Sequence, residues 1–168
     1  MTRNPFQTEL RDALRSLKPT HMATVNYAKP LSGGRDTRHR TVLRHLREWN
    51  RNVLEALFGR KFSQRNIDDA FLFVGFIEIG ALLGKEHVHL LIRVPKPLTE
   101  IFEQNATLLW RPKQIAPVAA HSSSPLQSDV LIRRIYDTEG AVRYCTKDVR
   151  DHADNIVFSN EFRVITVP

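Results

Sequence analysis

Two histidines lie two positions apart in an apolar run, at His87 and His89 of the segment EHVHLLIRV (86–94). On a β-strand the side chains of residues i and i+2 point to the same face, so both imidazoles face one opening while Val88 points into the core. Such a pair also arises by chance, and half-buried histidines that bond only to their neighbours are the plainer interpretation. A third ligand on the same face would favour a metal site.

An acid in the preceding apolar run can supply that third ligand. The run AFLFVGFIEI (70–79) has the character of a buried strand, in which an unpaired carboxylate at Glu78 would be costly. If a hairpin turn is centred between Leu82 and Leu83, antiparallel pairing places Glu78 directly opposite His87 and on the same face. The carboxylate then joins the two imidazoles at one opening.

Two imidazoles and one carboxylate leave coordination positions free for water and substrate, as a catalytic metal requires and a structural metal does not. This donor set accommodates Mn²⁺ well, and the free positions of Mg²⁺ or Mn²⁺ can take phosphate oxygens. Glu86 is a rival carboxylate, although strand alternation points it away from the histidines. The sequence therefore predicts that Glu78, His87 and His89 bind one divalent cation, Mg²⁺ or Mn²⁺.

A tyrosine and a lysine offer a nucleophile for phosphorus. The segment GAVRYCTKDVRDHA (140–153) is typical of a helix, which puts Tyr144 and Lys147 on one face. A free phenol, with a pKa of about 10, is only about 0.1% ionised at neutral pH and needs a nearby positive charge or a base. Neither rival tyrosine, Tyr27 or Tyr136, has a lysine three residues on. A tyrosine that only packs or lies on the surface is the alternative.

The elements that must position these residues predict one α+β domain over residues 1–168, with a core over about 21–168. Besides the two strands and the helix already described, the sequence predicts helices over about 7–17, 37–58 and 98–110, strands over 21–28 and 128–137, a loop over 111–125, and one or two short strands within 155–168. No internal repeat and no long linker marks a domain boundary. We expect an antiparallel sheet with flanking helices.

The charge balance favours a polyanionic partner. The chain has 25 Lys+Arg against 18 Asp+Glu, a formal net charge of +7 and a pI near 10.0. Lys and Arg that contact phosphates release counterions, which drives binding to nucleic acid. Arg40 and Arg44 belong to an arginine-rich face of the 37–58 helix that could follow a DNA backbone. A solvated helix face is the commoner interpretation of such a run.

The single cysteine and the absence of long apolar stretches bear on the compartment. Cys145 alone can form neither an intramolecular disulfide nor a multi-cysteine zinc site, so we expect a reducing cytoplasm. Next to Tyr144 on a helix it points about 100° away, and we interpret it as a packing residue. No run reaches the roughly 18 apolar residues of a membrane span, so we expect no membrane partner.

Taken in order, these motifs resemble those of the HUH endonucleases, and among them the Rep proteins that initiate rolling-circle replication. EHVHLLI (86–92) resembles the second HUH motif, and YCTKD (144–148) resembles the YxxK third motif. The nine-residue gap from Glu78 to His87 is similar to that of small circular-DNA Reps. ATVNY (23–27) resembles their first motif, a strand that carries threonine and asparagine.

The resemblance implies a HUH/Rep nuclease fold with RRM-like topology, in which the sheet carries the metal ligands and a covering helix carries the tyrosine. It implies that single-stranded or hairpin origin DNA is nicked and rejoined through a 5′-phosphotyrosine, with release of a 3′-hydroxyl. The chain has no GxxxxGK[ST] loop, so a host helicase would unwind the DNA. The expected DNA contacts are Thr24, Asn26, Arg143, Arg40 and Arg44.

Three other readings stay open. A single-tyrosine HUH transposase of a small insertion sequence, or its relative acting on repetitive palindromes, shares the chemistry, although the YCTK pattern favours a Rep protein. A non-enzymatic nucleic-acid binder could keep the sheet without the metal. A hydrolytic zinc enzyme could use two histidines and one glutamate. A covalent adduct with DNA would separate the nickase and the transposase from the other two.

Overall fold

The protein is described by a computed structural model, in which residues 5–60, 62, 71–79, 84–110, 128–149 and 155–162 are placed. The helices are α1 (Pro5–Ser16), α2 (Arg35–Phe58), α3 (Thr99–Asn105) and α4 (Thr138–Cys145), with short 3-10 turns η2 (Lys96–Leu98) and η3 (Ser159–Phe162). The strands are β1 (His21–Tyr27), β2 (Leu72–Ile79), β3 (Glu86–Arg93), β4 (Ser128–Arg134) and β5 (Ile156–Phe158).

The five described strands form one sheet in the order β4-β1-β3-β2-β5, and every neighbouring pair is antiparallel. This confirms the expected α+β class with a central antiparallel sheet. β3 lies in the middle, so the strand that carries both histidines has a partner on each side. Residues on β1 and β2 therefore flank the histidines.

The register of β3 with its two neighbours fixes which side chains can meet. Glu78 pairs with His87 across the β2–β3 hairpin, which is the register expected from a turn centred between residues 82 and 83. On the other side of β3, Asn26 pairs with His87 and Thr24 pairs with His89. One face of the sheet thus presents two histidines between a carboxylate and two small polar side chains.

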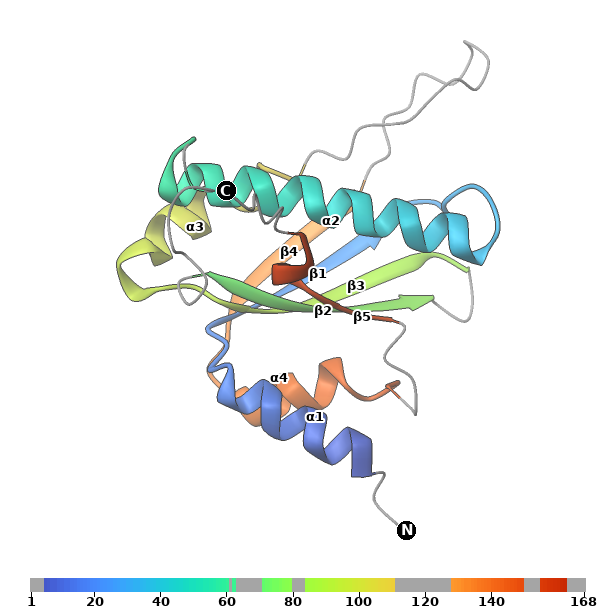
Figure 1. The fold of residues 1–168 in the computed structure, drawn as a ribbon, viewed down its shortest axis with the longest axis horizontal. Helices are drawn as coiled ribbons and strands as arrows, with labels where there is room; N and C mark the ends of the chain where they lie inside the picture. Colours follow the sequence, from blue (N-terminus) through green and yellow to red (C-terminus); the bar gives the residue numbers. More distant parts are fainter. Residues whose placement is uncertain are drawn as a thin grey trace, which may run out of the picture.

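Helices cover both faces of the sheet (Figure 1). α2 and α3 lie on one face, and α1 and α4 lie on the other. The α2 face buries the apolar stripe expected for that helix, including Val42, Leu46, Trp49 and Val53. Gly59 ends α2 with a positive φ of 81°, where its N–H donates to Glu55 O at 2.8 Å.

The α1 and α4 face has a smaller apolar core of its own. Leu14 of α1 and Val142 and Cys145 of α4 pack with Phe76 and Leu91 of the sheet. Because successive strand residues alternate between faces, these sheet residues share their face with the predicted site residues. The site therefore lies beside this second core, on the side away from α2.

Three elements are shorter than expected. α3 ends at residue 105 rather than 110, β4 ends at 134 rather than 137, and α4 covers 138–145 rather than 140–153. The loop expected over 111–125, and parts of the segments expected over 140–153 and 155–168, lie outside the described residues. Within 155–168 the described part contains β5 and then η3.

No helix of the described ranges is long and apolar enough to cross a membrane.

The boundaries of α4 have local causes. The Asp137 side chain accepts a hydrogen bond from Gly140 N at 2.9 Å and caps the helix start, which ends the preceding extended segment. At the other end, the Thr146 hydroxyl donates to Val142 O at 2.8 Å. The N–H of Lys147 then bonds weakly to a carbonyl three residues earlier, at 3.4 Å. The helix tightens into a turn, and that turn carries the lysine.

Candidate functional site

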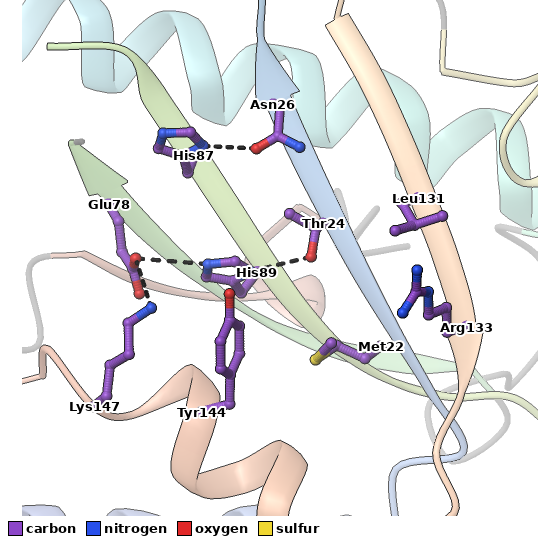
Figure 2. A pocket seen from close by; sticks show the side chains of 10 residues that line it. All are labelled: Met22, Thr24, Asn26, Glu78, His87, His89, Leu131, Arg133, Tyr144 and Lys147. Atoms are coloured by element: carbon purple, nitrogen blue, oxygen red, sulfur yellow. Dashed lines mark hydrogen bonds and ion pairs between the residues drawn. The ribbon is translucent and has the colours of Figure 1, made fainter. Parts of the chain in front are cut away.

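A pocket on the α1 and α4 face of the sheet gathers most of the predicted site residues (Figure 2). It is lined by Met22, Thr24, Asn26, Glu78, His87, His89, Leu131, Arg133, Tyr144 and Lys147. The residues come from β1, β2, β3, β4, α4 and the turn that follows α4. All five residues predicted to bind metal or to catalyse are among them, as are Thr24 and Asn26.

His89 lies on β3, which is flanked by β1 and β2, and it is only 4% exposed. Its Nδ1 is 3.2 Å from Thr24 Oγ1, and its Nε2 is 3.6 Å from Glu78 Oε2. A hydroxyl can donate or accept, so Thr24 can hold either tautomer of the ring. When Nδ1 carries the proton, the lone pair of Nε2 points toward the carboxylate side of the pocket.

His87 is oriented by Asn26. The His87 Nδ1 lies 2.7 Å from Asn26 Oδ1. An amide oxygen only accepts hydrogen bonds, so Nδ1 donates in this contact and the neutral ring carries its lone pair on Nε2. Polar partners that select the tautomer of a ligating histidine are a regular feature of metal sites.

Glu78 is a charged group in a half-buried position. Its burial raises the pKa, but the contact with His89 and the electrostatic interactions with Lys147 and His87 outweigh burial and hold the pKa below its ordinary value. The carboxylate is therefore ionised at neutral pH. One of its oxygens, Oε1, is buried without a hydrogen-bond partner among the described residues.

The residues fit a divalent cation in donor chemistry, although not in their present side-chain positions. Within the described ranges, no group of three His, Cys, Asp or Glu side chains stands ready to hold a metal ion. The unpartnered Glu78 Oε1 is a donor that a cation would satisfy, next to an imidazole on the same face. The site at Glu78, His87 and His89 stays a prediction.

The ring of Tyr144 packs against His89 in the pocket. Its ring meets the His89 ring edge to face, with 4.9 Å between centroids, and the side chain is 46% exposed. In Figure 2 its hydroxyl is directed toward the sheet beside His89. The phenol thus lies beside the predicted metal ligands in a residue that is partly exposed to solvent.

Lys147 lies between the tyrosine and the glutamate, although it belongs to the turn after α4 and not to the helix. Its Nζ is 4.3 Å from the centre of the Tyr144 ring and 3.8 Å from Glu78 Oε2. Asp148 Oδ2 also lies 3.8 Å from Nζ, and all these contacts are long enough to leave the ammonium hydrogens available to a substrate oxygen. The expected proximity of Tyr144 and Lys147 is confirmed.

The rival residues are accounted for by their surroundings. Tyr27 is buried on the α2 face, where its hydroxyl lies 2.9 Å from His45 Nδ1, and Tyr136 is 93% exposed outside the pocket. Glu86 is buried away from the histidines, where it accepts from Leu31 N at 3.0 Å. Cys145 is fully buried, and burial raises the pKa of its thiol to about 12. Tyr27, Glu86 and Cys145 therefore have structural roles in packing or hydrogen bonding, whereas Tyr136 lies at the surface.

The expected DNA contacts are only partly brought together. Arg143 lies on α4 with its Nε 4.0 Å from Glu139 Oε1, and it does not line the pocket. Arg40 and Arg44 belong to α2, which covers the opposite face of the sheet (Figure 1). Any DNA held by these two arginines would lie on a different surface from DNA held in the pocket.

Three pocket residues were missed in the sequence. Met22, Leu131 and Arg133 line the side of the pocket nearest β4, where Met22 pairs with Arg133 across the β1–β4 ladder. The alternation of β4 places Leu131 and Arg133 on one face, which was the available signal. No local sequence pattern predicts the pairing of β4 with β1, because the two strands are far apart in the chain.

Comparisons with protein-family models, with curated proteins and with solved structures find no match to this chain. Its function therefore has to follow from the site itself. The site combines an accessible phenol, a lysine, an ionised carboxylate and two histidines on one face of the sheet. Such a set is suited to nucleophilic attack on phosphorus.

Proposed function

We propose that this protein is a single-tyrosine DNA nickase of the HUH type, with a Rep-like role in starting rolling-circle replication. The observation that carries the proposal is the packing of Tyr144 against His89, with Lys147 between that ring and Glu78. The order of the motifs and the central position of the histidine strand agree with a HUH/Rep nuclease fold of RRM-like topology. The β2–β3 register supports the same reading.

In the proposed reaction the phenolic oxygen of Tyr144 attacks the phosphorus of one phosphodiester. A tyrosyl O–P bond forms as the bond between phosphorus and the 3′-oxygen breaks, and the phenol loses its proton while the departing 3′-oxygen gains one. The products are a 5′-phosphotyrosine and a free 3′-hydroxyl, and the reverse reaction rejoins the strand. Lys147 supplies positive charge where the negative charge of the transition state develops.

Glu78, His87 and His89 would hold a divalent cation, Mg²⁺ or Mn²⁺. When bound, that cation would polarise the phosphate under attack. Asn26 and Thr24 orient the two imidazoles through their Nδ1 atoms. The chain's own contribution is thus an ionised carboxylate and two rings of defined orientation beside the nucleophile.

Single-stranded or hairpin-extruded DNA is the proposed substrate, because in-line attack needs a phosphodiester that can enter the pocket. Next to the reactive groups, Met22 and Leu131 offer apolar contact and Arg133 offers a positive charge. This combination suits an unpaired nucleotide with its phosphate. A host helicase would have to expose such a strand at a duplex origin.

Covalent capture tests the proposal. A library of single-stranded and hairpin oligonucleotides carrying a 3′-fluorophore is incubated with the protein and Mn²⁺, and the mixture is then denatured. A fluorescent protein band that resists denaturant is expected from the intact chain and not from Tyr144→Phe or after chelation. A nucleic-acid binder or a zinc hydrolase gives no such band, and its absence across the library contradicts the proposal.

A further inference from the structure

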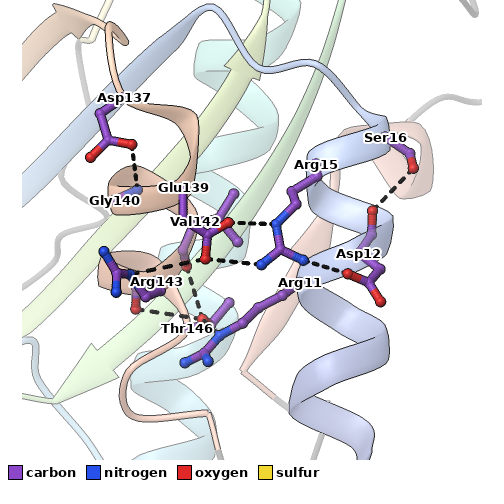
Figure 3. A network of polar contacts seen from close by, with 10 residues as sticks. All are labelled: Arg11, Asp12, Arg15, Ser16, Asp137, Glu139, Gly140, Val142, Arg143 and Thr146. Atoms are coloured by element: carbon purple, nitrogen blue, oxygen red, sulfur yellow. Dashed lines mark hydrogen bonds and ion pairs between the residues drawn. The ribbon is translucent and has the colours of Figure 1, made fainter.

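α1 contributes no side chain to the pocket, yet it contacts both ends of the segment that carries Tyr144 and Lys147 (Figure 3). Near the start of α4, Arg15 donates to both carboxylate oxygens of Glu139, at 2.6 and 2.9 Å. Beyond the end of α4, Arg11 Nε donates to Thr146 Oγ1 at 2.9 Å. Tyr144 thus lies between these two points of attachment, and Lys147 directly follows the second.

The backbone of the turn after α4 is also held by α1. Gln7 Nε2 donates to Thr146 O at 2.7 Å and to Val149 O at 3.3 Å. These two carbonyls bracket Lys147 in the chain. Carbonyls at a helix end have no partner within the helix, so an external amide donor determines how the chain leaves α4.

α4 needs such support because it is short. It has eight residues, and isolated helices below about 12 residues are marginal in water. Apolar contacts add to the polar ones, since Leu14 of α1 belongs to the same buried cluster as Val142 and Cys145. The partly buried Leu10 and Leu17 pack against that cluster. Thr146 is itself fully buried under α1, so its backbone has little freedom while α1 is docked.

We propose that Gln7 and Arg11 are positioning residues, which hold the 146–149 turn so that Lys147 Nζ stays between the Glu78 carboxylate and the Tyr144 ring. Lys147 is the link to the site, because its Nζ is within 3.8 Å of Glu78 Oε2 and 4.3 Å of the ring centre. The inference rests on the proposed function, and it gives α1, which lies outside the pocket, a role in the proposed reaction.

The first test removes the amide donors of Gln7 and keeps the length of the side chain. Gln7→Met should lower the rate of adduct formation at saturating DNA on the order of 10-fold, because small displacements of a positioned group slow a reaction strongly. The DNA dissociation constant should not change. Gln104→Met is the matched control, since Gln104 is exposed on α3 and contacts Glu100.

A double-mutant cycle separates positioning from general destabilisation. If Gln7 acts through Lys147, then Gln7→Met combined with Lys147→Ala is no slower than Lys147→Ala alone. A loss of the same size in both backgrounds shows that Gln7 acts on the fold as a whole, and it overturns the inference. Thermal unfolding of each variant confirms that the rates refer to folded protein.

Amide hydrogen exchange supplies a measurement that needs no DNA. Gln7→Met should speed exchange at residues 146–149 and leave β3 unchanged, while Gln104→Met should alter neither. Unchanged exchange at 146–149 overturns the inference even if the wild type forms adducts. If the wild type forms no adduct with any oligonucleotide, the proposed function fails, and with it the role given to α1.

Discussion

The rings of Tyr144 and His89 meet edge to face, with 4.9 Å between their centroids and an interplanar angle of 75°. The tyrosine comes from α4 and the histidine from the middle strand of the sheet. This contact places the only phenol of the pocket beside a predicted metal ligand. Tyr27 and Tyr136 lie elsewhere, so the proposed reaction has a single candidate nucleophile among the chain's three tyrosines.

Removing the charge of Glu78 should weaken both metal binding and catalysis. Glu78→Gln keeps the shape of the side chain but replaces an anionic oxygen by an amide, so we expect Mn²⁺ affinity and adduct formation to fall on the order of 10²-fold. Isothermal titration with Mn²⁺ and single-turnover rates measure the two effects. Glu100→Gln, on the exposed side of α3, is the control. Unchanged Mn²⁺ affinity in Glu78→Gln removes this residue from the ligand set.

Lys147 should contribute to rate and not to DNA affinity. Lys147→Ala should slow adduct formation roughly 10²- to 10³-fold, because a positioned charge that meets a developing anion typically contributes a few kcal/mol. Lys147→Arg keeps the charge and should retain more of the rate. Equal losses in the two variants show that the site needs the ammonium itself and not only its charge.

The pocket and α2 offer two competing surfaces for DNA. If the DNA strand lies in the pocket, Arg133→Ala should weaken DNA binding about 10-fold. It should also reduce the slope of log affinity against log salt concentration by about one, because one phosphate contact is lost. Arg40→Ala on the opposite face is the comparison. Fluorescence anisotropy over a range of salt concentrations measures both, and a larger effect from Arg40→Ala places the DNA on α2.

The buried His45 should make stability depend on pH. Burial, and to a lesser degree the charge of Arg44, lowers the His45 pKa from 6.5 to about 4. The unfolded chain therefore binds a proton at higher pH than the folded chain, so the free energy of unfolding should fall as the pH drops from about 6.5 to about 4.

Substitution of His45 itself isolates this effect on stability. His45→Gln keeps an acceptor for the Tyr27 hydroxyl but cannot titrate, so it should flatten the loss of stability in that pH range. Denaturant unfolding at several pH values measures it, with His39→Gln as the control. A slope that persists in His45→Gln assigns the pH dependence to other groups.

Two pairs of pocket residues, Glu78 with His87 and Tyr144 with Lys147, could be predicted from the sequence because each pair depends on a local pattern. The Glu78–His87 pairing follows from a hairpin, in which the turn position alone sets the register. The closeness of Tyr144 and Lys147 follows from their spacing in the chain, even though Thr146 ends the helix between them. Neither prediction needed knowledge of the complete sheet.

The remaining parts depend on contacts between distant segments. Arg133 reaches the pocket because β4 pairs with β1, and Gln7 reaches the 146–149 turn because α1 docks on α4. The apolar spacing of α1 predicts a helix but not the surface it covers. For the same reason the arginine face of α2 could not be assigned to one side of the sheet from the sequence.

Mapping the covalent adduct tests the central claim most directly. The wild type and Tyr136→Phe are expected to form the adduct, because Tyr136 lies outside the pocket, whereas Tyr144→Phe is expected to form none. Mass spectrometry of the digested adduct should then find a nucleotide 5′-phosphate on Tyr144. A nucleotide on any other residue, or an adduct that persists in Tyr144→Phe, would contradict the account.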